Sequence, residues 1–337
     1  MVDVAREAGV HPATASRALS PDRQGEVSVA TAQRVRRTAE RLGYVPNTLA
    51  RSLRTSRSYV AALFVPDITN ALFPPIVRGA EQVLTDAGFT LVLTDTNNAA
   101  EVERSQIASM RAHGIDGFIM ATASWEDPLL DDLAAEGFPT VLVNRRCATS
   151  ELPFVGGDDQ QGIRLCVEHL ADLGHRDIVH LAGPADTSTG RERADAFRAA
   201  VRDRGLPARN AVLECAAYTE QAGVAGAERL LARRRPFTAV VAANDLLALG
   251  IMDGLAGAGL ECPRDYSLTG FNDLAFMDKL TPPLTTVRVP FTEMGAQAAR
   301  CLLDWISHAR PTATRSMLPV ELVVRGTTGP VRTDHFS

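Results

Sequence analysis

The spacing of apolar positions predicts a cluster of short helices at the start of the chain. Residues 3–19 contain two helical patterns that are interrupted at Gly9. Two short helices joined by a tight turn form a helix-turn-helix, whose second helix enters the major groove of DNA. Apolar residues of both helices recur at the i, i+3, i+4 spacing of a buried stripe: Val4, Ala5 and Ala8 in the first, and Ala15, Ala18 and Leu19 in the second.

A third helix is expected to complete this small core. Ser28 is in position to cap its start, and Gly43 is expected to end it. Three helices over about 40 residues bury little apolar surface, so this unit is marginal without a neighbour or DNA. The inner face of the third helix is predicted to carry Ala32, Val35, Ala39 and Leu42.

Residues 46–57 form a short, weakly amphipathic segment after the third helix. An isolated helix needs roughly 12–15 residues to persist in water, so this segment is expected to fold only against a partner. We interpret it as a hinge helix that forms on DNA. An ordinary linker is the alternative.

From Tyr59 onward, apolar strand-like runs alternate with helical stretches. Continuous apolar runs are typical of parallel strands buried on both faces, and their alternation with helices predicts doubly wound α/β lobes with right-handed crossovers. Roughly 270 residues suit two such lobes. The expected strands are 60–65, 90–93, 117–120, 140–143, 178–182, 239–243 and 267–271, and the expected helices are 75–87, 102–113, 162–173, 191–204, 246–258 and 293–306.

The charge distribution separates the start of the chain from the rest. Residues 1–57 carry ten arginines against five acidic residues, whereas the remainder has 25 basic and 35 acidic residues. A basic module on an acidic body is suited to binding phosphates while the body avoids DNA. On charge alone, a solvated helix face is an equal alternative.

Several classes of protein are disfavoured by what the sequence lacks. It has no apolar run of about 18 residues and no secretory signal pattern, so we expect a cytoplasmic protein without a membrane span. The five cysteines are scattered without a CxxC pair, which argues against a disulfide framework. No nucleophile elbow, Walker loop or metal-spaced His/Cys cluster is present, so we expect no enzyme activity, cofactor or metal.

Polar side chains gather in five loops that directly follow predicted strands. Bidentate polar groups with an aromatic platform suit a polyhydroxylated or heterocyclic small molecule. Any one loop could merely cap a helix, but their shared edge of the sheets favours a ligand cleft between the lobes. The loops are Asp67–Asn70 with Phe73, Asn144–Arg146, Thr187–Arg193, Asn244-Asp245 and Phe271–Asp273.

Across residues 1–329 the chain resembles the LacI/GalR family of transcriptional regulators. The resemblance implies an all-α helix-turn-helix head, a hinge helix and a periplasmic-binding-protein-like α/β core of two doubly wound lobes. Eight segments carry it in the right order: DVAREAGVHPATASRAL (3–19), RLGYVPNTLARSLRT (41–55), VPDITNALFPPIVRGAE (65–81), HLADLGHRDIVHLAGP (169–184), RERADAFRAAV (191–201), TAVVAANDLLALG (238–250), LTPPLTTVRVP (280–290) and ELVVRGTT (321–328).

The same resemblance implies domain boundaries. Residues 1–45 would form the DNA-binding domain, 46–57 the hinge helix, 58–329 the core and 330–337 a tail. Within the core, the N-lobe would comprise about 58–157 and 287–318, and the C-lobe about 158–286 and 319–329. Because the tail has no heptad pattern, a homodimer is expected rather than a larger assembly.

The function implied is that of a repressor that binds a palindromic double-stranded operator and is controlled by a small effector, a sugar or sugar derivative. Ala13 would pack against a thymine methyl group, Arg17 would pair with guanine, and Leu53 would wedge between base steps in the minor groove. The residues implied to contact DNA are Pro12, Ala13, Thr14, Ser16, Arg17, Asn47, Ala50 and Leu53, and those implied to contact the effector are Phe73, Asn144, Arg193, Asn244, Asp245 and Asn272.

Two departures from the family pattern affect these expectations. Asn144 and Asn272 stand where family members often have aspartates, and amides donate as well as accept hydrogen bonds. An acidic sugar or another polar metabolite is therefore favoured over a plain neutral hexose. His11 replaces the serine that usually caps the recognition helix, at an expected cost of up to about 1 kcal/mol.

Two other classes of protein share a two-lobed core. A solute receptor that feeds a transporter is one alternative, but the basic head and the missing export signal count against it. An enzyme is the other, with His169, His175 and His180 as the residues to consider. Their positions at helix ends and within a strand favour structural roles.

Overall fold

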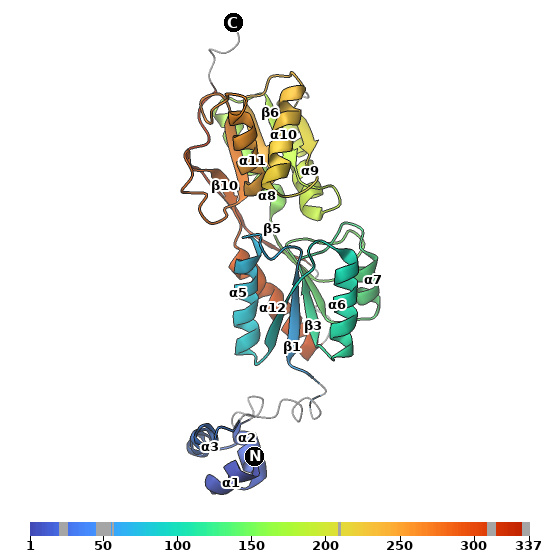
Figure 1. Cartoon of the computed structure of the whole chain (residues 1–337), viewed down its shortest axis with the longest axis vertical. Coiled ribbons are helices and arrows are strands. Elements are labelled where there is room, and N and C mark those ends of the chain that lie inside the picture. The colour runs from blue at the N-terminus through green and yellow to red at the C-terminus, as the bar shows by residue number, and fades with distance from the viewer. Residues whose placement is uncertain (20–25, 45–54, 56, 208–209, 309–314, 332–337) are drawn as a thin grey trace.

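The structure is a computed structural model that describes residues 1–19, 26–44, 55, 57–207, 210–308 and 315–331. It comprises a small helical head and two α/β lobes that follow one another along the long axis of the molecule (Figure 1). The predicted fold class is confirmed. Among the helices of the described residues, none combines the length and apolar character needed to cross a bilayer.

The head contains α1 (Val2–Glu7), α2 (Pro12–Leu19) and α3 (Val29–Arg41). Gly9 and Gly43 adopt positive φ angles of 62° and 59° at the turns where the sequence predicted them. Ser28 caps α3 by accepting a hydrogen bond from the Thr31 amide. The apolar residues at the centre of the head are Val4, Ala5, Ala8, Ala15, Ala18, Val35 and Ala39.

The structure differs from two expectations about the head. His11 does cap α2, because its Nδ1 accepts a hydrogen bond from the Ala13 amide at 3.2 Å. Leu42 is 43% exposed, since the chain turns outward at Gly43, and Thr38 lies on the buried face of α3 instead. Helix α1 has no side-chain cap, and Asp3 pairs with Arg6 in its first turn.

The N-lobe is built on a six-stranded parallel sheet with the order β11-β5-β4-β3-β1-β2. Helices α5 and α12 pack against each other on this sheet, and α6 and α7 lie on its other side (Figure 1). The strands are β1 (Val60–Val65), β2 (Thr90–Asp95), β3 (Gly117–Met120), β4 (Thr140–Val143), β5 (Phe154–Gly157) and β11 (Arg315–Leu318), and the helices are α5 (Phe73–Asp86), α6 (Ala100–Ala112), α7 (Pro128–Ala135) and α12 (Phe291–Ser307).

The C-lobe repeats this plan with the strand order β12-β10-β9-β8-β6-β7. Its strands run parallel except for β12, which is antiparallel to β10. The strands are β6 (Ile178–Ala182), β7 (Ala211–Glu214), β8 (Ala239–Ala242), β9 (Ser267–Asn272), β10 (Thr285–Arg288) and β12 (Glu321–Val323), and the helices are α8 (Asp159–Asp172), α9 (Ser188–Asp203), α10 (Glu220–Ala232) and α11 (Asp245–Ala256).

The chain passes between the lobes three times: between β5 and α8, between β10 and α12, and between β11 and β12. The second passage follows Arg288 and not residue 286 as the expected lobe boundary had it, because β10 pairs with β9 in the C-lobe sheet. Because all three connections lie between the same two lobes, they allow a hinge rotation of one lobe against the other. The carboxyl ends of the two sheets still face one another during such a rotation.

Two glycines let α5 and α12 cross at close range. A Cβ on Gly79 would lie 1.9 Å from the Thr292 carbonyl oxygen, and one on Gly295 would lie 1.9 Å from the Ile76 carbonyl oxygen. Either contact is far too short, so a side chain there would force the helices apart. This crossing fixes α5, whose first residue is Phe73.

We predict that Gly79→Ala and Gly295→Ala each lower the free energy of unfolding by about 2 kcal/mol or more, because they overpack this crossing. Urea titrations followed by circular dichroism measure the change. Gly257→Ala is the matched control, since its new Cβ would have no neighbour closer than 3.5 Å. Equal stability of all three variants would show that α5 and α12 can move apart to accommodate the added methyl group without a loss of stability.

His180 is a buried histidine of β6 whose ring is kept neutral. Its Nδ1–H donates to the Val241 carbonyl oxygen at 2.8 Å, and the ring stacks on Phe197. Burial lowers its pKa to about 4. Because the unfolded chain takes up this proton near the ordinary pKa of 6.5, the stability that neutral His180 contributes is lost as the pH falls below that value.

We predict that wild type loses about 2 kcal/mol more unfolding free energy between pH 7 and pH 5 than His180→Gln does. All other titrating groups are common to the two proteins, so the difference isolates this histidine. Urea titrations at both pH values provide the comparison. Parallel losses in the two proteins would mean that His180 titrates normally in the folded state.

Candidate functional site

The recognition face of the head is the side of α2 that the small core leaves uncovered. Ala15 and Ala18 are buried, whereas the opposite side is exposed or partly exposed. The Arg17 guanidinium is 3.9 Å from the Glu26 carboxylate, and its side chain is 41% exposed. An exposed pair at that distance binds weakly, so Arg17 can reach a base or phosphate. The predicted DNA contacts on this side are Pro12, Ala13, Thr14, Ser16 and Arg17.

The remaining predicted DNA contacts, Asn47, Ala50 and Leu53, lie outside the described residues, as does most of the expected hinge helix. Residues 57–59, which follow this segment, are bonded to the N-lobe. Arg57 donates to the Ile306 carbonyl oxygen at the end of α12. The Asp116 carboxylate accepts hydrogen bonds from the Ser58 and Tyr59 amides at 3.0 and 2.6 Å. These bonds fix residues 57–59 to the N-lobe.

Two adjoining cavities lie between the lobes, next to the carboxyl ends of the strands. The larger has a volume of about 390 Å³, and the smaller recess has a volume of about 20 Å³. Four residues line both of them: Asn70, Phe73, Arg145 and Tyr218. We call the two together the interlobe cleft.

Five of the six predicted effector contacts line the recess. They come from the starts of helices and the ends of strands in both lobes, which is why residues so far apart in sequence meet here. These five are Phe73, Asn144, Arg193, Asn244 and Asn272.

Asn144 and Asn272 have unusual backbone conformations. Their φ angles are +64° and +113°, in a region that side chains other than glycine rarely adopt. Such strain clusters at binding sites, where the surrounding fold maintains it. The Oδ1 atom of Asn272 is buried and has no hydrogen-bond partner among the described residues. A donor on a bound ligand would satisfy it.

Arg193 lines the recess and is held by several bonds to the protein. Its Nε and Nη2 donate to Asp159 Oδ1 at 2.9 and 2.8 Å, and its Nη1 donates to the Ala243 carbonyl oxygen. Its guanidinium also lies 3.8 Å from the centre of the Phe271 ring. Burial raises the pKa of Asp159 to about 6, although Arg193 opposes the shift. With three of its five N–H donors used by the protein, Arg193 keeps two for a ligand.

The neighbours Asn244 and Asp245 have different roles. Asn244 Oδ1 caps α11 by accepting from the Leu247 amide, which leaves its amide group as a donor toward the recess. Asp245 lines neither cavity. Its carboxyl group accepts from the Thr286 hydroxyl and the Leu274 amide, and burial raises its pKa to about 7. Its position is that of a structural group behind the cleft.

Several cleft residues were absent from the predicted effector contacts. Tyr218 lies between β7 and α10, two elements that the sequence patterns did not predict, and its hydroxyl is 2.9 Å from Thr189 Oγ1. Glu103 reaches the cleft from the first turn of α6 and accepts from the Thr122 hydroxyl at 2.5 Å. Arg145 belongs to the predicted ligand loop Asn144–Arg146 but was not among the implied effector contacts.

Contacts at the side of the cleft join the lobes directly. The Arg146 amide donates to Ser188 Oγ at 3.0 Å, and the Arg146 side chain pairs with Glu192. The Trp125 amide donates to the Asp186 carbonyl oxygen at 2.6 Å. Arg146 and Trp125 belong to the N-lobe and their partners to the C-lobe, so these bonds hold the lobes in the arrangement seen here.

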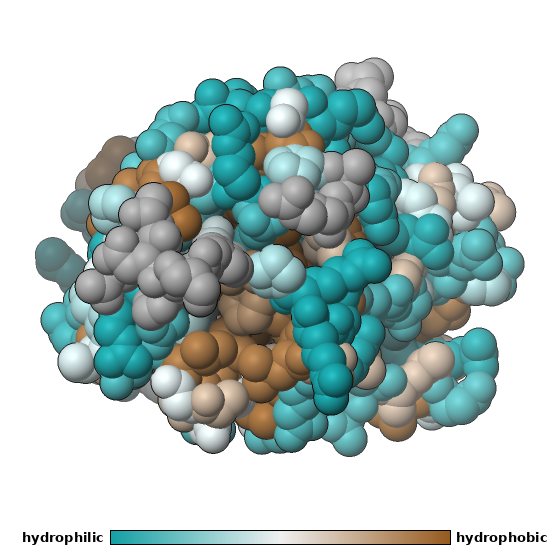
Figure 2. Space-filling view, turned by 90° about the horizontal axis from the view of Figure 1, so that it is seen from above, coloured by the Kyte–Doolittle hydropathy of each residue, from teal (hydrophilic) through white to brown (hydrophobic). Residues whose placement is uncertain are grey.

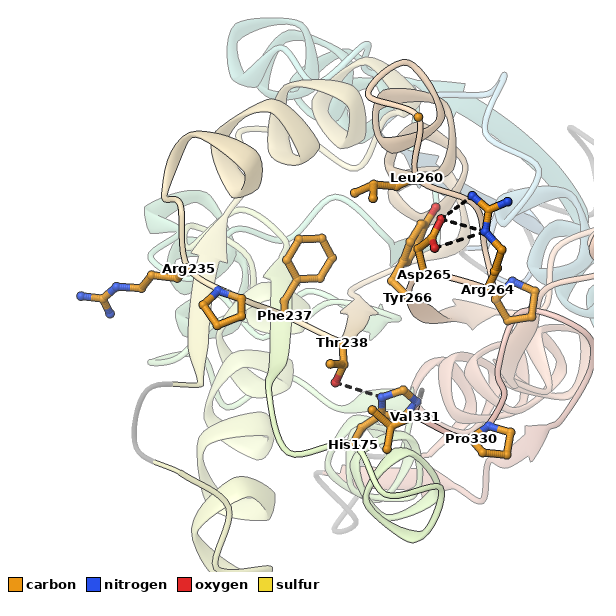
Figure 3. A pocket seen from close by; sticks show the side chains of 13 residues that line it. His175, Arg235, Phe237, Thr238, Leu260, Arg264, Asp265, Tyr266, Pro330 and Val331 are labelled. Atoms are coloured by element: carbon orange, nitrogen blue, oxygen red, sulfur yellow. Dashed lines mark hydrogen bonds and ion pairs between the residues drawn. The ribbon is translucent and has the colours of Figure 1, made fainter. Parts of the chain in front are cut away.

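The far end of the C-lobe carries a second, mostly apolar cavity of about 440 Å³ (Figure 3). Seen from that end, apolar residues gather in a hollow of a mainly polar face (Figure 2). Phe237, Leu260 and Tyr266 line the cavity, and His175 bonds to Thr238 Oγ1 at 3.0 Å. The cavity adjoins the starts of β8 and β9, whereas ligands of such sheets bind at the carboxyl ends.

The three histidines considered for catalysis have structural partners. His180 is buried in β6, His175 bonds to Thr238, Ser267 and Gly329, and His169 bonds to Thr328. Within the described residues, no group of three or more His, Cys, Asp or Glu is arranged to hold a metal ion.

Family models match both parts of the chain. Residues 1–47 match the model for bacterial regulatory proteins of the lacI family, and residues 167–328 match the periplasmic binding protein-like domain.

Full-length relatives agree with these matches. The HTH-type transcriptional regulator DegA of Bacillus subtilis (strain 168) is 30% identical, covering 98% of each chain. Among solved structures, the CelR–cellobiose complex has a TM-score of 0.75 and 30% identity, covering 96% of this chain and 98% of that one. The Lac repressor dimer bound to operator has a TM-score of 0.79 and 25% identity, covering 97% and 98%. These relatives are transcriptional regulators and not enzymes. The chain therefore belongs to the LacI family of bacterial transcriptional regulators.

Proposed function

We propose that the chain is a cytoplasmic repressor whose affinity for operator DNA is set by a sugar or sugar derivative bound in the interlobe cleft. The observation that carries this proposal is the unsatisfied Oδ1 of Asn272, buried in a recess lined by both lobes. A buried acceptor without a partner costs free energy, which a hydroxyl donor of the ligand would recover. CelR, a relative of similar fold, has been solved with cellobiose.

The chemistry of the recess supports a polyhydroxylated ligand. Asn144, Asn244 and Asn272 supply amides that can donate to and accept from neighbouring hydroxyl groups. Phe73 supplies an apolar surface for the C–H face of a ring. These groups come from both lobes, so one ligand would hold N-lobe and C-lobe residues together.

The head would bind DNA as one half of a homodimer. Two heads related by a twofold axis read a palindromic site, and the Lac repressor dimer has been solved on its operator. Within each head, α2 would lie in the major groove. Asn47, Ala50 and Leu53, which fall outside the described residues, would contribute from the hinge segment.

Control of DNA binding would follow from lobe rotation. A ligand that contacts both lobes binds one lobe arrangement better than another and shifts the population toward it. Arg57 and Asp116 fasten the connecting segment to the N-lobe, so a rotated N-lobe moves the point from which each head departs. In a dimer this changes the spacing of the two heads.

We predict that Arg17→Ala weakens binding to an operator selected from random duplex by roughly 10- to 100-fold, because a bidentate arginine–guanine pair contributes about 1–3 kcal/mol. Ligand binding should be unchanged. Fluorescence anisotropy measures the operator affinity, and Arg164→Ala, an exposed arginine of α8, is the control. Wild-type affinity in Arg17→Ala would remove this residue from the recognition face.

We predict that Asn272→Ala reduces the affinity for the bound sugar at least roughly 10-fold, because a ligand hydroxyl loses its buried partner. Calorimetry with the tightest member of a panel of neutral and acidic sugars measures it. Asp245→Asn is the matched control, since Asp245 lines neither cavity, and it should retain wild-type affinity. Loss of binding in the control alone would assign the contact to Asp245.

A further inference from the structure

Arg145 is a cation of the interlobe cleft that forms no ion pair within the described residues, and the Asp186 carboxylate attracts it only from beyond ion-pair distance. Arg145 lines both the larger cavity and the recess. Among the described residues, its side chain makes no hydrogen bond and no ion pair, and its Nε is buried without a partner. Its one aromatic contact is with the Tyr218 ring, whose centre is 5.8 Å away.

The neighbouring arginines differ in this respect. Arg193 is paired with Asp159, and its Nη2 is 2.8 Å from that carboxylate. Arg146, the next residue along the chain, is paired with Glu192, and its Nε is 2.6 Å from that carboxylate. The absence of a partner is therefore particular to Arg145 among these three and not a general property of the cleft.

An arginine cannot relieve this situation by losing its proton at neutral pH. Burial lowers the pKa of Arg145, which reflects the cost of removing its charge from water. The cation–π contact with Tyr218 recovers less free energy than the burial of an ion costs. A planar guanidinium with free donors matches a carboxylate or phosphate in a two-pronged arrangement.

The acidic residues of the interlobe cleft line the larger cavity and not the recess. Glu103 is bonded to Thr122, and Asp67 accepts from the amide and hydroxyl of Thr69. Asp186 lines the larger cavity and attracts Arg145, but it is exposed to solvent and forms no ion pair with that arginine. None of the three lines the recess. The recess therefore combines the free cation with neutral amides, while the carboxylates face the larger cavity.

We propose that the ligand of the interlobe cleft is an acidic sugar, a sugar that carries a carboxylate or a phosphate, and that Arg145 is the residue that selects this anionic group. The inference rests on the proposed function and specifies its ligand class. The anionic group would lie at Arg145, which lines both cavities. Hydroxyl groups on one side of it would donate to Asn272 Oδ1 in the recess, and those on the other side would donate to the carboxylates of the larger cavity.

The test uses the full-length protein and matched pairs of probes: D-glucose with D-glucuronate and D-glucose 6-phosphate, D-galactose with D-galacturonate, and D-ribose with D-ribose 5-phosphate. Calorimetric titrations at pH 7.5 give the affinities. In at least one set, the acidic member should bind roughly 10-fold or more tightly than its neutral counterpart, as expected for hydrogen bonds to a charged group. The affinities for the uronates and for the sugar phosphates show whether a carboxylate or a phosphate is preferred.

Arg145→Gln should weaken the preferred acid by roughly 10- to 100-fold and leave the neutral sugar nearly unaffected. Arg145→Lys keeps the positive charge but loses the planar guanidinium, so its affinity for the preferred acid should lie between those of wild type and Arg145→Gln. This variant also provides the test if Arg145→Gln does not fold. Arg164→Gln removes an exposed arginine charge of α8 and should match wild type for every probe.

The inference about an acidic ligand would be overturned if, in every probe set, the neutral sugar bound as tightly as its acidic counterpart. The proposed function would still be supported in that case if a neutral sugar altered the affinity for the operator. An equal loss of neutral and acidic probes in Arg145→Gln would also overturn it, because Arg145 would then bind hydroxyl groups or support the fold. A full-length protein that binds none of these probes would contradict both proposals.

Discussion

The constraint on which this molecule depends is the opposition of two parallel sheets whose carboxyl ends face one another. Three passages of the chain between the lobes enforce that opposition, and the bonds of Arg146 and Trp125 to the C-lobe set one arrangement of the lobes. The ends of strands and the starts of helices then meet across a single gap. Polar backbone and side-chain groups left over at those ends become the walls of the interlobe cleft.

The sequence revealed most of this architecture because its central strands are continuous apolar runs. β1, β3, β4, β6, β8 and β9 were predicted almost to the residue. Five strands were missed because none has a distinctive apolar pattern. β7, β11 and β12 are short and partly exposed, β5 ends in two glycines, and three of the four residues of β10 are polar. Helix α10 was missed because Gly223 and Gly226, which allow close packing, weaken its helical signal.

The site was predictable where side chains follow strongly patterned strands and unpredictable where they do not. Asn144, Asn244 and Asn272 come directly after, or at the end of, such strands. Tyr218 follows a strand that had no signal, and Asp159 could not be recognised as the partner of Arg193 from sequence. Asp245 shows that a position in a loop after a strand does not by itself place a side chain in the cleft. Residues adjacent in sequence can point to opposite sides, and its carboxyl group bonds to Thr286 behind the cleft.

Coupling between the cleft and DNA is the central claim, and operator affinity with and without ligand tests it most directly. Fluorescence anisotropy of the full-length protein on its selected operator gives the dissociation constant in each state. The account predicts that a saturating ligand of the interlobe cleft changes this constant by roughly 5- to 150-fold in wild type, the usual range for allosteric coupling. An operator affinity that stays constant while calorimetry shows the cleft filled would contradict it.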